Sequence, residues 1–135
     1  MSEASSLHIR VDRFGARGPA LIMIHGFAAT NINWRRWIPE LEKRFQLHLI
    51  ELKGHGTAPA PADGRYSPTD HADSVVRYVR SLQAEHVALV GHSMGGGVAM
   101  LAALTLMKDE PRKLCALVSL AGAAYPQRLP PFIRL

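Results

Sequence analysis

The sequence predicts an α/β fold in which helices flank a mostly parallel sheet. Apolar runs typical of buried strands alternate along the chain with segments of helical periodicity, and no internal repeat is present. Residues 20–24 contain no polar side chain, which is typical of a parallel strand buried on both faces. A chain of 135 residues has the length of one domain and can bury a core.

In the first third of the chain, the sequence predicts two strands, at residues 7–11 and 20–24, and an interrupted helix. Residues 7–11 alternate apolar and polar side chains, as a strand with one solvated face does. Apolar residues recur at helical spacing over residues 34–45, but Pro39 would break a continuous helix. We therefore expect a short turn and then a helix with this proline in its first turn. The side chains of Trp34 and Trp37 are expected to pack this segment onto the sheet.

Three more strands are predicted, at residues 45–52, 87–90 and 114–120, because each is a short, mainly apolar run. A loop rich in proline and glycine, residues 54–66, follows the first of these. The last strand carries the single cysteine, Cys115. Since its neighbours are apolar, we expect this thiol to be buried as a small hydrophobe.

Residues 67–83 predict the most clearly delimited helix. Ser67 suits the N-cap, and Asp70 completes a capping-box-like pattern with a proline at the first helical position. His71 is expected on the surface. The predicted buried stripe consists of Ala72, Val75, Val76, Val79 and Leu82.

The strand at 87–90 leads into Gly91-His92-Ser93-Met94-Gly95, and an apolar helix is predicted over 98–107. A Gly-x-Ser-x-Gly pattern between a strand and a helix predicts a sharp turn that exposes the serine hydroxyl. Such a turn strains the serine backbone and leaves room only for minimal side chains two residues away, which Gly91 and Gly95 provide. Backbone N–H groups at the helix N-terminus point toward Ser93. This arrangement is typical of a nucleophile.

The chain resembles the α/β-hydrolase family through three motifs in the family's order. The serine motif at residues 91–95 is the last of them along the chain. His25-Gly26-Phe27 follows a predicted strand, where the family carries its oxyanion loop, and Gly54-His55-Gly56 follows the next strand. The family usually has Asp-x-Arg-Gly-His-Gly at the latter place, whereas this chain has Glu51 and Lys53, a mild departure. The resemblance spans residues 7–122.

The resemblance implies a serine hydrolase whose catalytic nucleophile is Ser93. The oxyanion hole would be formed by the backbone N–H groups of Phe27 and Met94. The substrate would be a small-molecule carboxylic ester or a similar acyl compound, and no cofactor or metal ion is expected. The residues that support these motifs are His25, Gly26, Gly91, His92 and Gly95.

The rest of a catalytic triad does not follow Ser93, although the family's order is serine, acid, histidine. Only Asp109 and Glu110 are acidic there, about 20 Å away at ~1.5 Å per helical residue, and no histidine follows. None of the upstream histidines at 25, 55 and 92 is expected to act as the base. We therefore expect one incomplete α/β-hydrolase domain over residues 1–135. It would lack the C-terminal strands, be inactive alone, and begin a lid at residues 123–135.

Two other classes of function remain open. The chain could be a hydrolase-like protein that binds a ligand without turnover. It could also be a dinucleotide-binding module, because Gly91-x-x-x-Gly95-x-Gly97 matches a nucleotide-loop spacing. That motif normally follows the first strand, however, and an acidic residue normally ends the next one. Neither condition is met, which disfavours the dinucleotide reading.

The charge and the lengths of the apolar runs indicate which kinds of partner the chain does not bind. The net charge is +5, but the basic residues are scattered rather than gathered in a stripe, so no nucleic-acid binding is expected. We expect no membrane span and no signal peptide, because the apolar runs are too short and the N-terminus lacks the required pattern. A cytoplasmic location is the default. The uncharged, apolar strand at 114–120 would lack a neighbour, so self-association through it is expected.

Overall fold

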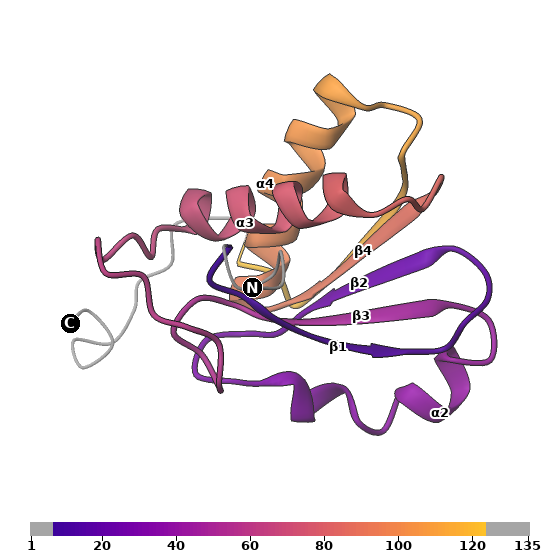
Figure 1. Ribbon diagram of the computed structural model, residues 1–135, viewed down its shortest axis with the longest axis horizontal. Coiled ribbons are helices and arrows are strands. Elements are labelled where there is room, and N and C mark those ends of the chain that lie inside the picture. Colours follow the sequence, from indigo (N-terminus) through magenta and orange to yellow (C-terminus); the bar gives the residue numbers. More distant parts are fainter. Residues whose placement is uncertain (1–6, 124–135) are drawn as a thin grey trace.

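A computed structural model describes residues 7–123, and in them five strands form one sheet in the order β1-β3-β2-β4-β5 (Figure 1). Only β1 is antiparallel to its neighbour; the other pairs are parallel. The predicted α/β class with a mostly parallel sheet is therefore confirmed. The strands are β1 (Arg10–Phe14), β2 (Ala20–Ile24), β3 (Gln46–Glu51), β4 (Val87–His92) and β5 (Leu114–Leu120).

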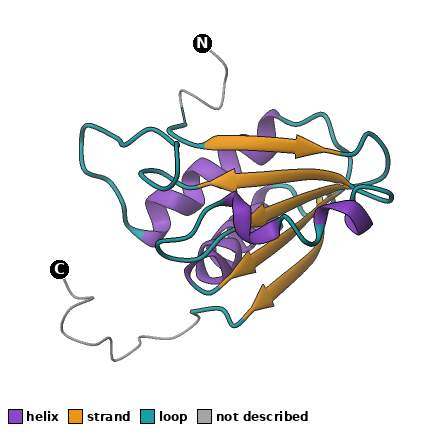
Figure 2. Cartoon of the chain, turned by 90° about the horizontal axis from the view of Figure 1, so that it is seen from below, coloured by secondary structure: helices purple, strands orange, loops and turns teal. Residues whose placement is uncertain are grey.

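Helices cover both faces of the sheet, unequally. The two long helices, α3 (Pro68–Ser81) and α4 (Met94–Asp109), lie together on one face (Figure 1). In the described part of the chain, the other face carries only a 3-10 turn, η1 (Asn31–Trp34), and the short helix α2 (Ile38–Leu41) (Figure 2). Pro39 lies in the first turn of α2, as the sequence predicts. None of the helices within residues 7–123 is long and apolar enough to cross a bilayer.

Two apolar clusters hold these layers together, one on each face of the sheet. Side chains alternate across a strand, so β2 contributes to both. Ile22 and Ile24 pack with α3 and α4, whereas Leu21 and Met23 pack with Trp34. Every residue of β2 is buried, which confirms the prediction of a strand buried on both faces.

Helix α3 begins with the predicted capping box. The Ser67 hydroxyl accepts the Asp70 N–H at 3.1 Å, and the Asp70 carboxylate accepts the Ser67 N–H at the same distance. The prediction of a surface position for His71 is wrong, because only 3% of this residue is exposed. The rings of Tyr66 and His55 lie 6.4 and 6.1 Å from its ring, so the preceding loop folds back over the first turn of the helix.

Two elements begin at other residues than the sequence predicts. Strand β1 begins at Arg10 rather than at residue 7, because its pairing with β3 runs from Arg10–Glu51 to Phe14–Leu47. Leu7 and Ile9 are nevertheless buried in the core. Helix α4 begins at Met94, four residues earlier than its apolar run suggests.

Two packing expectations fail at least in part. Trp34 is buried, but Trp37 is 52% exposed and does not help to seal the sheet. Cys115 is exposed, contrary to its predicted burial, because β5 lies at the edge of the sheet. An apolar sequence neighbourhood does not reveal whether another element covers a strand. Of the predicted lid start at residues 123–135, all but residue 123 lies outside the described residues.

Candidate active site

Ser93 is the single residue between the end of β4 and the start of α4. Its φ of 53° and ψ of −119° place a non-glycine residue in a sparsely populated region of backbone space. Conformations of this kind cost of order 1–3 kcal/mol and persist only where the surroundings enforce them. The side chain is half-buried at the carboxyl end of the sheet.

The surroundings that enforce this turn are backbone atoms packed against glycines. A Cβ at Gly91 would overlap the carbonyl oxygen of Gly95, and a Cβ at Gly95 would overlap the carbonyl oxygens of Ile24 and His25. Position 95 therefore packs the first turn of α4 directly onto the end of β2. No larger residue fits at either position without displacing the backbone.

The segment after β2 lies against Ser93. A Cβ at Gly26 would stand 3.2 Å from the Ser93 Cβ and 3.3 Å from His92 Nδ1. Among the described residues, no carbonyl accepts the backbone N–H of Phe27 or Met94, the two amides that flank this contact in sequence. Unpaired donors beside a half-buried hydroxyl suit an incoming anionic oxygen.

His25 ties this segment to the end of β3. Its Nε2 accepts the Leu52 N–H at 3.0 Å, so Nδ1 carries the proton and donates it to the Gly26 carbonyl at 2.7 Å. Burial lowers the pKa of this imidazole, and the nearby His55 lowers it further, against the Gly26 hydrogen bond and the charge of Glu51. With both ring nitrogens engaged, His25 is not free to take a proton from Ser93.

The other nearby histidines also leave Ser93 without a base. The His55 ring lies 5.0 Å from that of His25, and its Nδ1 lies 3.0 Å from the Lys53 carbonyl oxygen. His92 is exposed. Within residues 7–123, the Ser93 hydroxyl makes no hydrogen bond to any imidazole.

The two acids downstream of Ser93 are engaged elsewhere. At the far end of α4, Arg80 donates to Asp109 at 2.6 Å and to Glu110 at 2.8 Å. These ion pairs link α3 to the end of α4. The structure thus agrees with the sequence argument that neither acid reaches the serine.

A small pocket of about 180 Å³ borders the site. A larger hollow of about 770 Å³ is formed by residues 84–86 and 110–113, at the opposite, amino-terminal ends of β4 and β5. The larger hollow is remote from Ser93, so the smaller pocket is the candidate binding space for a substrate. Its lining residues are His25, Asn33, Trp34, Trp37, His92 and Leu120.

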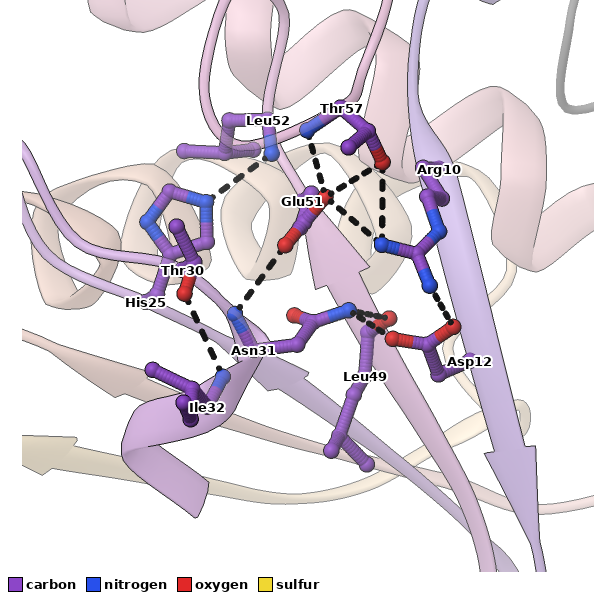
Figure 3. Close-up of polar contacts among 10 residues, drawn as sticks. All are labelled: Arg10, Asp12, His25, Thr30, Asn31, Ile32, Leu49, Glu51, Leu52 and Thr57. Carbon is purple, nitrogen blue, oxygen red and sulfur yellow. Dashed lines mark hydrogen bonds and ion pairs between the residues drawn. The ribbon is translucent and has the colours of Figure 1, made fainter. Parts of the chain in front are cut away.

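Sequence reasoning missed a polar cluster at the end of β3. Glu51 is noted there only as a departure from a family pattern, and Asn31 is not noted at all. Both are buried, at 4% and 6% exposure, and the Asn31 N–H donates to the Glu51 carboxylate (Figure 3). A charged residue at the end of a largely buried strand was the available signal, since buried charges are paired. No group of three or more potential metal ligands is present in residues 7–123.

The fold and this site define an α/β-hydrolase. The chain belongs to that family: the family model for the alpha/beta hydrolase fold matches residues 19–134. Its relatives include the pimeloyl-[acyl-carrier protein] methyl ester esterase of Aeromonas hydrophila, 32% identical over 87% of this chain and 42% of that protein. Another is the 2-hydroxymuconate semialdehyde hydrolase of Pseudomonas sp. (strain CF600), 32% identical over 91% of this chain and 44% of that protein.

Solved structures of hydrolases superpose on this chain and agree with the family assignment. A marine microorganism esterase superposes with a TM-score of 0.73 at 31% identity, covering 82% of this chain and 40% of that one. A membrane phospholipase A superposes with a TM-score of 0.77 at 27% identity, covering 90% of this chain and 38% of that one. The chain thus spans about two-fifths of the length of these relatives.

Proposed function

We propose that this chain is the nucleophile-bearing part of a serine hydrolase that acts on a carboxylic ester or a similar acyl bond. The observation that carries the proposal is the position of Ser93: it lies on a strained strand–helix turn, with Gly26 against its side chain and two unpaired amides beside it. Relatives named as esterases support the reaction class.

In the proposed reaction, the Ser93 hydroxyl oxygen attacks the acyl carbon while a general base removes its proton. The carbonyl oxygen becomes an anion that accepts hydrogen bonds from the Phe27 and Met94 amides. Donors of this kind are each worth about 3–4 kcal/mol in related acyl-transfer sites. The C–O bond to the leaving group breaks as the base returns its proton to that oxygen, so the alcohol departs. Water then attacks the acyl-enzyme, releasing the carboxylic acid and restoring the Ser93 hydroxyl.

The base and its orienting acid would come from residues outside 7–123, because no described histidine bonds to Ser93. The described part would then form one incomplete domain with little activity by itself. That same absence supports a second candidate, a hydrolase-like protein that binds an acyl ligand without turnover. A dinucleotide site is less well supported, since the Gly96 and Gly97 amides already donate to the Ser93 carbonyl.

Fluorophosphonate labelling tests the proposal, because these reagents react with activated serine nucleophiles. The product of the complete reading frame should be labelled at one site, identified as Ser93 by peptide mass spectrometry. The Ser93→Ala variant should not react. A folded wild-type protein that binds acyl ligands but resists the reagent would support the non-catalytic candidate.

A further inference from the structure

Glu51 is a buried carboxylate on which three separate segments converge (Figure 3). It ends β3, and only 5% of its side chain is exposed. The groups that donate to it come from the segment after β2, from the loop after β3 and from β1. They are the Asn31 N–H at 3.4 Å, the Thr57 N–H at 3.0 Å, the Thr57 hydroxyl at 3.3 Å and the Arg10 guanidinium at 3.3 Å.

Every polar group that contacts this side chain is a hydrogen-bond donor, which suits a carboxylate but not the amide of a glutamine, which has the same shape. An ionised carboxylate only accepts hydrogen bonds, whereas a glutamine amide would turn an NH₂ group toward at least one N–H. Space is equally restricted, because a Cβ at Gly56 would overlap the Glu51 carboxylate. The site is therefore shaped for a negative charge.

The cluster fixes both ends of the segment that carries Phe27. At its start, His25 Nε2 accepts the Leu52 N–H at 3.0 Å. At its end, Glu51 accepts the backbone N–H of Asn31, whose side chain also donates to the Leu49 carbonyl at 2.8 Å. The two anchors, Glu51 and Leu52, are the last residue of β3 and the residue after it (Figure 3). The segment between His25 and Asn31 is therefore held at both ends, and its Gly26 lies against Ser93.

Electrostatics keep this anchor charged. Burial alone would raise the pKa of Glu51, but hydrogen bonds from Thr57 and Asn31 and the charge of Arg10 outweigh it and hold the pKa below its usual value. The carboxylate is therefore ionised at neutral pH. A hydrogen bond to an ionised carboxylate is stronger than one to a neutral group, so the charge strengthens each of these contacts.

We propose that Glu51 is a positioning residue for the oxyanion hole: by anchoring Asn31, it holds the Phe27 amide at a fixed place beside Ser93. Glu51 itself would not touch the substrate. This inference rests on the proposed function, since it assigns the Phe27 amide the role of an oxyanion donor. It explains why a glutamate with four donors ends the strand that precedes Gly54-His55-Gly56.

The test compares Glu51→Gln, which keeps the shape and removes the charge, with Glu51→Asp, which keeps the charge on a shorter side chain. Fluorophosphonate kinetics on the product of the complete reading frame separate reagent affinity from the rate of the covalent step. Glu51→Gln should slow the covalent step roughly 10- to 100-fold with little change in affinity, because small misplacements of stabilising groups act on the transition state. Glu51→Asp should recover part of that loss.

Two controls separate positioning from general destabilisation. Glu40→Gln removes an exposed glutamate paired only with Lys43, and it should leave the kinetics unchanged. Val75→Ala weakens the core on α3 and should lower the melting temperature without slowing the covalent step. If Val75→Ala slows labelling as much as Glu51→Gln does at equal stability, the positioning role is overturned.

Amide hydrogen exchange supplies a readout that does not need activity. Exchange at residues 27–31 should accelerate in Glu51→Gln, while exchange in α3 should stay as in the wild type. Should the wild-type protein resist labelling altogether, the proposed function fails and exchange alone decides the anchoring role. Unchanged exchange at residues 27–31 overturns the inference in either case.

Discussion

At the scale of single residues, the site depends on positions where a side chain is missing. Ser93 keeps its strained backbone because Gly91, Gly95 and Gly26 allow three stretches of backbone to meet around it. A methyl group added at position 91 or 95 would overlap backbone oxygens, and one at position 26 would crowd the Ser93 Cβ at 3.2 Å. The candidate nucleophile is therefore defined as much by its neighbours as by its own hydroxyl.

Gly95→Ala should destabilise the fold by about 2 kcal/mol or more, because the added methyl group overlaps backbone carbonyls that cannot move away easily. Urea denaturation measures the change. Gly64→Ala is the control: its φ is 66°, but nothing lies within 4 Å of the added Cβ. It should cost only the roughly 1–2 kcal/mol of a left-handed backbone. Equal losses in the two variants would contradict the steric argument.

Two buried histidines predict acid sensitivity. Burial lowers the pKa of His48 to about 4, helped by the charge of Arg13, and burial also lowers that of His71 to about 4, helped by His55. Both are neutral when folded but take up protons near pH 6.5 when unfolded. The unfolded state then binds more protons between these values, so this stability is complete above about pH 6.5 and is lost as the pH falls toward 4.

Denaturant midpoints measured between pH 7.5 and 4 should fall across that window. His71→Gln removes one of the two titrating groups and should make the decline shallower. His86→Gln is the control, because His86 is exposed on the surface and should leave the slope unchanged. A wild-type midpoint that stays flat from pH 6.5 to 4 would rule out this account.

At the scale of elements, the start of α3 is stabilised locally, whereas β5 leaves one edge of the described sheet unpaired. Helix α3 carries its own N-terminal cap, so its start is determined locally. Strand β5 lies at the edge of the sheet, and five of its seven residues are exposed although none is charged. An edge of this composition invites pairing with another strand.

Ser67→Ala should cost about 1 kcal/mol of unfolding free energy, since it leaves the Asp70 amide without its capping acceptor. Thermal or urea denaturation measures the loss. Asp73→Ala is a suitable comparison, because Asp73 makes only a long, exposed ion pair with Arg77 on the same helix. That variant should change stability by less than about 0.5 kcal/mol. Similar costs for both would mean that the cap does not define the start of α3.

We propose that the 135-residue chain self-associates through β5, as expected of an uncharged edge. Sedimentation velocity should show oligomers at micromolar concentration. Val118→Lys, at a position 44% exposed on β5, should shift them toward monomer. Leu104→Lys, 66% exposed on α4, should not. A monodisperse wild-type monomer would refute the proposal. If Leu104→Lys dissociates the oligomers and Val118→Lys does not, the contact lies on α4 instead of β5.

At the scale of the whole molecule, the described part contains the candidate nucleophile and oxyanion donors but no triad base or acid in place. It spans about two-fifths of the length of its relatives. We predict that the complete reading frame encodes an aspartate or glutamate and then a histidine after residue 135, in the family's order. Sequencing the flanking DNA tests this. A stop codon directly after Leu135, together with a folded product that binds acyl ligands, would favour the non-catalytic candidate.

The sequence by itself determined the α/β class, the strands at 20–24 and 114–120 and the capped helix α3, because each depends on local periodicity or local hydrogen bonds. It also predicted the strand–turn–helix arrangement around Ser93, since that motif is local too. These features need no knowledge of what lies nearby in space.

Only the tertiary structure decided what covers each residue. His71 is buried because the loop carrying Tyr66 folds over it, and Cys115 is exposed because β5 has no outer neighbour among the described strands. The anchoring of Asn31 by Glu51 likewise joins residues 20 positions apart. Which loop covers a residue and which distant residue pairs with it are properties of the assembled sheet, so the local pattern around His71, Cys115 and Asn31 did not specify them.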